Sequence, residues 1–452
     1  MAEKKKVGMV SLGCPKNLVD SEVMMGLLAR NGFELTNDPA NAEVVVVNTC
    51  GFIESARQES VDTILEMAQF KQSGKLERLV VAGCLVERFR EQLQLEMPEI
   101  DSCIGVNQLK DVLNAVSPNG VKSLPVYSEG TAVPELYLYD ETTPRLRATA
   151  PYTAYIKIAE GCDHTCAFCI IPKLRGSFRS RSPESIIKEA EMLAEQGVKE
   201  VVLISQDTTN YGTDLDLESG LARLVEALAR VGGIEWVRFL YCYPTNITDD
   251  LLRVVADNPN VCSYFDIPLQ HASRRVLARM RRGGSREHYE RLIERIRSRV
   301  PGAAVRTTFI VGFPGETDDD FQELVDFVRR VKFDRVGVFT YSDEDKSPAF
   351  DLDGKVDSRH ARQREQMLMT EQARISQRKN RDMKGSRIRV LLEGRSRESD
   401  LLLEGRMESQ APEIDGCVLI NDVASGVEPH PGQFVTVEVT GAHEYDLIGR
   451  IV

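Results

Sequence analysis

The sequence is poor in aromatic residues and has no long apolar run. Phe, Trp and Tyr make up 6% of the 452 residues, and Trp occurs once. No segment approaches the ~20 consecutive apolar residues of a membrane-spanning helix, so we expect no membrane partner. The amino terminus also lacks the apolar core and the small-residue cleavage site of a secretion signal, which predicts a cytoplasmic protein.

An excess of basic residues is also lacking. The chain has 57 Lys and Arg against 69 Asp and Glu, a net charge of −12. Since affinity for phosphates comes from clustered Lys and Arg, this composition argues against a general nucleic-acid binder. Cysteine, in contrast, is frequent, with ten in the chain. The cytoplasm keeps thiols reduced, so clustered cysteines indicate metal ligation or catalysis rather than disulfides.

Residues 1–116 alternate short apolar runs with amphipathic helical patterns. The apolar runs are Val7–Leu12, Val44–Val47 and Leu79–Ala82. Short β-branched runs that are apolar throughout favour parallel strands buried on both faces. The pattern predicts an α/β domain with an open, doubly wound parallel sheet. Residues 117–150 contain several prolines and are predicted to form a linker.

A second βα series in residues 151–383 predicts a partial (β/α)6 barrel, because six units are fewer than the eight of a closed barrel. Residues 361–383 are predicted to form a surface helix. Residues 384–452 have short alternating runs separated by Gly and Pro, which predict a small β-barrel. The strand candidates of the middle domain are Ala154–Ala159, Glu200–Ser205, Trp236–Tyr241, Tyr264–Pro268, Val305–Gly312 and Arg335–Thr340.

Three cysteines lie close together just after the first strand of this barrel. Cys162, Cys166 and Cys169 form a C-x3-C-x2-C triplet. Three thiolates at this spacing can hold three corners of a 4Fe–4S cluster, whose fourth iron then has an open position. S-adenosylmethionine can chelate that iron, and an electron from the cluster can cleave it to a deoxyadenosyl radical. The alternatives are a zinc site that includes His164 and three buried core thiols.

Three further cysteines follow the three strand candidates of the N-terminal domain. Cys14, Cys50 and Cys84 each lie at or just past the carboxyl end of a strand. These ends share one edge of a parallel sheet, so the cysteines are expected to converge and hold a second cluster. The alternative is three buried thiols. The neighbouring glycines are expected to leave room for the inorganic group: Gly13, Gly51 and Gly83. The remaining cysteines are predicted to be core residues: Cys103, Cys242, Cys262 and Cys417.

Polar residues after other barrel strands are candidates for binding S-adenosylmethionine. Gln206 and Gln270 are the favoured side chains, and a loop cap is the alternative for each. Gly312 and Gly315 are expected to let the backbone turn or approach a ligand closely.

The triplet resembles the radical-SAM superfamily signature, in which an aromatic residue, here Phe168, precedes the last cysteine. With a second three-cysteine set and a β tail, nearly the whole chain is similar to the methylthiotransferase family. The resemblance implies two 4Fe–4S clusters, with the N-terminal cysteines on the auxiliary one, and a C-terminal TRAM domain that binds substrate. It also implies two uses of S-adenosylmethionine, as methyl donor and as radical source, a low-potential electron donor and a supply of sulfur.

The segment Ser11–Asn17 resembles one branch of this family, which methylthiolates an aspartate β-carbon in small-subunit ribosomal protein S-twelve. The branch that modifies transfer RNA typically carries Gln-Met where this chain has Pro15 and Lys16. Residues 384–452 contain seven basic and twelve acidic residues, a net charge of −5. An acidic tail suits a basic protein partner better than RNA.

Two runs of basic residues could contact RNA, so methylthiolation of transfer RNA stays an alternative. The same runs are also explained as solvated helix faces whose charge is balanced by nearby acidic residues. A non-catalytic iron–sulfur sensor or RNA-binding module is a further alternative, and it predicts clusters with complete protein ligation. The basic residues are Arg274, Arg275, Arg279, Arg281, Arg282 and Arg286, and Lys173, Arg175, Arg179 and Arg181.

Overall fold

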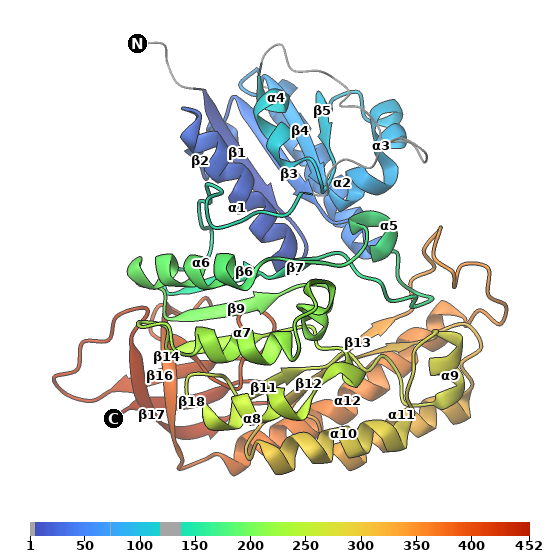
Figure 1. Cartoon of the computed structure of the whole chain (residues 1–452), viewed down its shortest axis with the longest axis vertical. Helices are drawn as coiled ribbons and strands as arrows, with labels where there is room; N and C mark the ends of the chain where they lie inside the picture. Colours follow the sequence, from blue (N-terminus) through green and yellow to red (C-terminus); the bar gives the residue numbers. More distant parts are fainter. Residues whose placement is uncertain (1–4, 73, 118–136) are drawn as a thin grey trace.

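The computed structural model describes residues 5–72, 74–117 and 137–452. Its N-terminal part is a five-stranded, wholly parallel sheet in the order β2-β1-β3-β4-β5 (Figure 1). The three predicted strands are confirmed as the centre of this sheet, and the two edge strands are additional. The strands are β1 (Lys6–Ser11), β2 (Glu34–Thr36), β3 (Val44–Thr49), β4 (Arg78–Gly83) and β5 (Ser102–Ile104).

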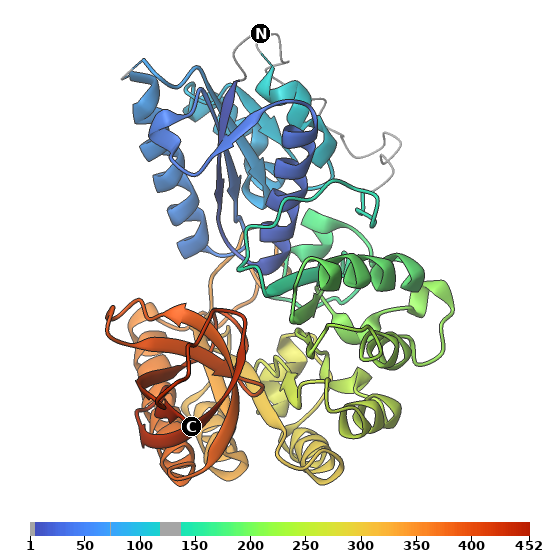
Figure 2. The same cartoon turned by 90° about the vertical axis from the view of Figure 1, so that its left-hand side faces the viewer.

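Helices cover both faces of this sheet (Figure 2). Val44 and Val46 of β3 pack in one apolar cluster with residues of α1 and α4, and Val45 and Val47 pack in another with residues of α2 and α3. Burial on both faces explains why the strand is a continuous run of valines. The helices are α1 (Pro15–Arg30), α2 (Glu54–Gln72), α3 (Cys84–Glu96) and α4 (Val112–Val116).

The middle part is the expected open barrel. Two three-stranded parallel sheets, β6-β9-β10 and β11-β12-β13, follow one another, and a parallel bridge between Val237 and Val261 links them. No strand pairing joins β6 to β13 in the described part of the chain, so the barrel is not closed. All six predicted strands are present: β6 (Thr153–Lys157), β9 (Glu200–Ile204), β10 (Trp236–Phe239), β11 (Tyr264–Asp266), β12 (Ala304–Val311) and β13 (Arg335–Thr340).

Several helices of the middle part begin at local capping signals. Thr317 and Asp320 form a reciprocal capping box at the start of α11, and Ser182 and Ser285 cap α6 and α10. Two short antiparallel strands, β7 (Ala159–Glu160) and β8 (Arg179–Ser180), flank the cysteine triplet in the sequence. The helices are α5 (Ile171–Arg175), α6 (Pro183–Glu195), α7 (Gly220–Leu228), α8 (Asp249–Asp257), α9 (Arg274–Arg279), α10 (Arg286–Arg299), α11 (Asp318–Val331) and α12 (Ser358–Asp382).

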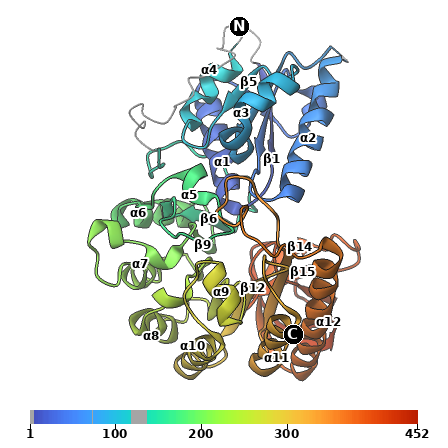
Figure 3. The ribbon, with the colours of Figure 1, turned by 90° about the vertical axis from the view of Figure 1, so that its right-hand side faces the viewer.

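The C-terminal part is a closed five-stranded barrel in the order β14-β15-β16-β18-β17. It follows α12, the predicted surface helix, and lies beside it in Figure 3. Four of its strands correspond to the alternating runs of the sequence, and β15 has no such run. The runs are Ile388–Leu392, Cys417–Ile420, Phe434–Val439 and Leu447–Val452. The strands are β14 (Arg387–Arg395), β15 (Leu403–Met407), β16 (Val418–Val423), β17 (Phe434–Ala442) and β18 (Leu447–Ile451).

A buried ion-pair network fastens this small barrel to the starts of the strands in the open barrel. Glu200, the first residue of β9, pairs with Arg406 of β15 at 2.6 Å and with Arg238 of β10 at 2.9 Å. Burial alone would raise the pKa of Glu200, but the two guanidinium groups outweigh it and lower the pKa to about 2. Tyr264, at the start of β11, donates a hydrogen bond to Asp415 at 2.7 Å.

The predicted linker is only partly within the described residues: Pro125 and Pro134 lie outside them. Its second half packs on α1, where Arg145 pairs with Glu22 at 2.5 Å and Tyr139 is buried. No helix of the described chain is long and apolar enough to span a membrane.

Candidate active site between two domains

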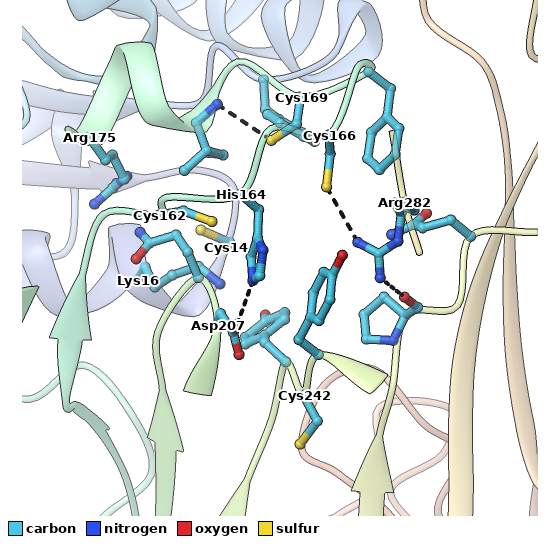
Figure 4. Close-up of a pocket in the computed structure, with 18 of the residues that line it drawn as sticks. Cys14, Lys16, Cys162, His164, Cys166, Cys169, Arg175, Asp207, Cys242 and Arg282 are labelled. Atoms are coloured by element: carbon cyan, nitrogen blue, oxygen red, sulfur yellow. Dashed lines mark hydrogen bonds and ion pairs between the residues drawn. The ribbon is translucent and has the colours of Figure 1, made fainter. Parts of the chain in front are cut away.

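Two sets of three cysteines, one from each of two domains, line one cavity of about 340 Å³ together with Cys242. Figure 4 labels Cys14 of the N-terminal set and all three cysteines of the other. The N-terminal three come from the ends of neighbouring parallel strands: Cys14 directly precedes α1, Cys50 follows β3, and Cys84 begins α3. The other set lies in the loop after β7. The cavity is therefore where the carboxyl edge of the N-terminal sheet meets the carboxyl ends of the barrel strands, which is where both folds bind ligands. The second set comprises Cys162, Cys166 and Cys169.

Glycines bring the N-terminal cysteine loops together, but not in the way the sequence predicted. A Cβ atom on Gly13 would lie 2.8 Å from the Cβ of Cys50, and one on Gly51 would lie 2.8 Å from the backbone of Cys84. The space beside these glycines is thus taken by the next cysteine loop, not left free for an inorganic group. Their role is close approach of backbone segments.

Burial sets the chemistry of the cysteines. It raises the pKa of the Cys50 and Cys162 thiols to about 11 and that of Cys169 to about 12, and it also raises the pKa of Cys84. Thiols buried without a metal stay protonated, whereas iron binds the thiolate and displaces the proton. Three thiols from each domain facing one cavity suit iron–sulfur clusters.

The zinc alternative has no support in the site. His164 does not complete a tetrahedral set, because its Nε2 lies 2.6 Å from Oδ2 of Asp207 and its ring stacks on Tyr243 at 3.8 Å. Within residues 5–72, 74–117 and 137–452, no three His, Cys, Asp or Glu side chains are placed to share a single metal ion. A 4Fe–4S cluster is larger than one ion and needs more widely spaced thiolates.

Each cysteine set has one arginine that donates to a sulfur atom. Arg175 of α5 lies 3.4 Å from Sγ of Cys84, and Arg282 lies 3.5 Å from Sγ of Cys166. Both side chains are buried. Hydrogen bonds of this kind tune a cluster's electronics once the sulfurs are ligated.

A buried network of charges connects the two domains beneath the cavity. Arg175 contacts Glu160 at 3.0 Å and Asp20 of α1 at 3.2 Å, and Lys157 of β6 pairs with both carboxylates. Burial opposes ionisation of Glu160, but Arg175 and Lys157 outweigh it and hold its pKa well below the ordinary value. Glu160 also accepts a hydrogen bond from Gln206 at 2.5 Å, which orients that amide.

The two predicted glutamines and Phe168 all line the cavity. Oε1 of Gln206 and Oε1 of Gln270 are buried without a hydrogen-bond partner. Gln270 also has a φ of +72°, an unusual conformation for a non-glycine residue. Buried acceptors without a partner and local backbone strain are typical of ligand-binding positions, and they fit the polar groups of S-adenosylmethionine.

Gly312 lies away from the cavity. It has a φ of +75°, and a Cβ atom there would lie 2.5 Å from the Cβ of Ala361 in α12. The residue allows close helix packing, and its predicted contact with a cofactor has no support from the cavity.

Several cavity residues were not singled out from the sequence. Tyr241 and Tyr243 after β10 have no motif of their own, and Lys16 of α1 was considered only as part of the segment Ser11–Asn17. Cys242 is buried in the apolar core as predicted, and it also lines the cavity. These residues share one local feature, since each lies within four residues after a strand or a cluster cysteine. Cys103 and Cys262 are core residues as predicted, and Cys417 is half-buried.

A second cavity of about 650 Å³ adjoins the first and shares Phe52, Phe168 and Gln270 with it. Its wall includes the loop after β13, where Glu344 pairs with Arg57 of α2 and with Arg88 of α3. This loop rises to the N-terminal domain in Figure 3. The second cavity gives a larger molecule a route to the cysteines.

The fold and the triplet define the class of protein. An open (β/α) barrel with three closely spaced cysteines at the carboxyl ends of its strands is a radical S-adenosylmethionine enzyme, which uses an iron–sulfur cluster and S-adenosylmethionine.

Comparison with known sequences agrees with this class and narrows it. Residues 156–328 match the Radical SAM superfamily, residues 6–105 match the Uncharacterized protein family UPF0004, and residues 384–452 match the TRAM domain. The ribosomal protein uS12 methylthiotransferase RimO of Solibacter usitatus is 52% identical over 99% of this chain and 95% of its own. RimO of Koribacter versatilis is 50% identical over 99% of this chain and 96% of its own. The chain belongs to this RimO family of methylthiotransferases.

A solved structure shares the fold at low sequence identity. The radical S-adenosylmethionine methyltransferase TsrM of Kitasatospora setae, with cobalamin and a [4Fe-4S] cluster bound, superposes with a TM-score of 0.54 at 14% identity. The match covers 75% of this chain and 72% of that one.

Proposed function

We propose that the protein adds a methylthio group to the β-carbon of an aspartate in ribosomal protein uS12. The observation that carries the proposal is the single cavity lined by two three-cysteine sets from two domains. One set suits a radical-generating cluster, and the other suits an auxiliary cluster that holds sulfur. The near full-length similarity to RimO proteins indicates the substrate.

The two sets would hold one 4Fe–4S cluster each, and neither has a fourth cysteine. Cys162, Cys166 and Cys169 would hold the first, and Cys14, Cys50 and Cys84 the second. When bound, these groups supply a deoxyadenosyl radical from S-adenosylmethionine and a methylated sulfur for transfer.

The chain's own residues orient the reactants and exclude water. Gln206, fixed by Glu160, and Gln270 present their free amide oxygens to S-adenosylmethionine. Phe168, between the two cavities, separates the radical site from bulk solvent. Arg282 is anchored by a 2.8 Å hydrogen bond to the carbonyl of Pro268 and neutralises negative charge at the triplet.

The surface charge favours a protein substrate over RNA. Of the seven basic residues in the C-terminal barrel, Arg406 is buried in its pair with Glu200, and Arg450 pairs with Glu438. The buried Arg406 is matched by the buried carboxylate of Asp415, which pairs with Arg306, so the barrel keeps the acidic balance of −5 that its sequence has. An acidic face complements a basic ribosomal protein.

The basic runs that suggested RNA contact are largely paired. Arg275 contacts Asp320, and Arg279 contacts Asp353. Arg175 and Arg181 are buried in ion pairs, and Arg282 points into the cavity. Few of these cations face solvent free to bind phosphates. Methylthiolation of transfer RNA therefore has less support than methylthiolation of the ribosomal protein.

The reaction also requires a low-potential electron donor and a sulfur source, and we place it in the cytoplasm, where ribosomal proteins are made.

The test uses anaerobically reconstituted protein with dithionite and S-adenosylmethionine, offered either uS12 or unmodified transfer RNA. We expect mass spectrometry to show a gain of about 46 Da on an aspartate of uS12, the replacement of hydrogen by SCH3. A gain on transfer RNA, with none on uS12, would refute the proposed substrate.

A further inference from the structure

The ammonium group of Lys16 is buried and has no carboxylate partner among the described residues. Lys16 lies in the first turn of α1, two residues after Cys14, and its side chain lines the cavity (Figure 4). Its Nζ makes one hydrogen bond, 3.4 Å from the carbonyl oxygen of Ser205, and lies 3.3 Å from the centre of the Tyr241 ring. No carboxylate of the described residues lies within 4.0 Å of it.

The carboxylates around the cavity already have other partners. Glu160 is held by Arg175 and Lys157, and Asp207 faces His164. A buried cation is costly to leave unpaired, so a cavity that presents one is built for an anion that arrives from outside.

The other cationic side chains near the cavity are paired, face the triplet or are exposed to solvent. Arg175 is neutralised by Asp20 and Glu160. Arg282 donates to Cys166 and so faces the triplet, where S-adenosylmethionine is expected to bind. Arg362, on the wall of the second cavity, is exposed and keeps its hydration. Lys16 alone is buried, unpaired and beside the N-terminal cysteines.

We propose that the ammonium group of Lys16 binds the side-chain carboxylate of the substrate aspartate and thereby selects an acidic residue for modification. This inference rests on the proposed function. The carboxylate carbon of aspartate is bonded directly to its β-carbon, so an ion pair at the carboxylate fixes the carbon that reacts. Held in this way, the β-carbon lies in the cavity that both cysteine sets face. A charge-assisted hydrogen bond also compensates the carboxylate for the water it loses on entry.

The experiment compares two enzymes with two substrates. Reconstituted wild type and Lys16→Met, which removes the charge at similar side-chain length, are loaded with S-adenosylmethionine without reductant. Each is titrated with fluorescently labelled uS12 and with uS12 carrying Asn at the modified position. We expect the wild type to bind the aspartyl protein on the order of 30-fold more tightly than the asparaginyl one, because truncating one side of a buried charge pair has effects of that size. In Lys16→Met this preference should fall to near unity.

Lys173→Met is the matched control, because Lys173 is exposed on α5 and donates to the carbonyl of Lys346 outside the cavity. It should keep the wild-type preference. Lys16→Arg, which keeps the charge, should retain a preference for the aspartyl protein if Lys16→Met fails to assemble its clusters.

Three results would overturn the inference: an undiminished preference in Lys16→Met, a loss of preference in Lys16→Arg equal to that in Lys16→Met, or weakened S-adenosylmethionine binding with the preference intact. Failure of the proposed function gives a different result, since the wild type would then add no methylthio group to uS12.

Discussion

Gly13 has a φ of +86°, and a side chain on it would collide with Cys50. This one residue links backbone conformation to metal binding, because the cysteines of the N-terminal set converge only if their loops approach closely. Gly32 has nearly the same φ, +87°, but has no atom within 4 Å of the position that a Cβ would take. Substituting each glycine therefore has a similar effect on the backbone, but only a side chain at Gly13 would displace a cysteine of the site.

We expect Gly13→Ala to lose the auxiliary cluster and Gly32→Ala to keep it. Both substitutions carry a similar strain of roughly 1–2 kcal/mol from the left-handed backbone. Only the first displaces Cys50. Iron analysis after reconstitution should show a deficit of about four irons per chain in Gly13→Ala. Equal iron content in the two variants would mean that the loops adapt without consequence for the site.

Among the site residues, the sequence predicts the cluster cysteines but not the role of Arg175, and both outcomes have a physical reason. The triplet could be found from its C-x3-C-x2-C spacing, and the three N-terminal cysteines from their places at strand ends, which meet at one edge of a parallel sheet. Arg175 could not be found, because its partners Asp20 and Cys84 are 155 and 91 residues away in the chain. Its role depends on how the two domains dock, which no local pattern encodes.

Among the secondary-structure elements, strands with a continuous apolar run could be predicted from the sequence, and strands without one could not. The valine run of β3 and the six barrel strands were predicted, since their burial follows from their own composition. The edge strand β2 has three residues, and β15 reads Leu-Glu-Gly-Arg-Met, so neither has an apolar run. In β15 the buried charge of Arg406 is satisfied by Glu200 of another domain. Tertiary contacts therefore override local propensity there.

The loop after β13 is attached to the N-terminal domain by two carboxylates, those of Glu344 and Asp345, which both pair with Arg88. Glu344 is buried and pairs with Arg57 and with Arg88, which lies at 2.7 Å and is itself buried. The neighbouring Asp343 is exposed and pairs with Lys355. The loop forms a wall of the second cavity, so its attachment to α2 and α3 defines the substrate route.

Glu344→Gln should detach this loop, because removing one side of a buried ion pair costs roughly 3–5 kcal/mol. Limited trypsin digestion after Lys346, which is exposed in the loop, reports the effect. We expect cleavage to accelerate by more than about tenfold. Asp343→Asn, the control, should digest like the wild type. A Glu344→Gln protein that is equally resistant would show that the ion pairs do not hold the loop.

At the scale of the whole molecule, the two ends of the open barrel have different partners. The N-terminal domain meets the carboxyl ends of the barrel strands and contributes one of the two three-cysteine sets. The C-terminal barrel docks at the strand starts through Glu200. No residue of the C-terminal barrel lines either cavity. Any contact of the TRAM domain with a substrate must therefore be made outside the cavities, on a partner large enough to reach both.

We propose that each of the two domains holds a separate cluster facing one cavity. The most direct measurement is iron content together with reductive cleavage of S-adenosylmethionine in Cys166→Ala and Cys50→Ala. We expect about eight irons per chain in the wild type and about four in each variant. Cys166→Ala should not cleave S-adenosylmethionine, and Cys50→Ala should cleave it without forming the methylthio product. Full iron content in either variant, or normal product from Cys50→Ala, would contradict the account.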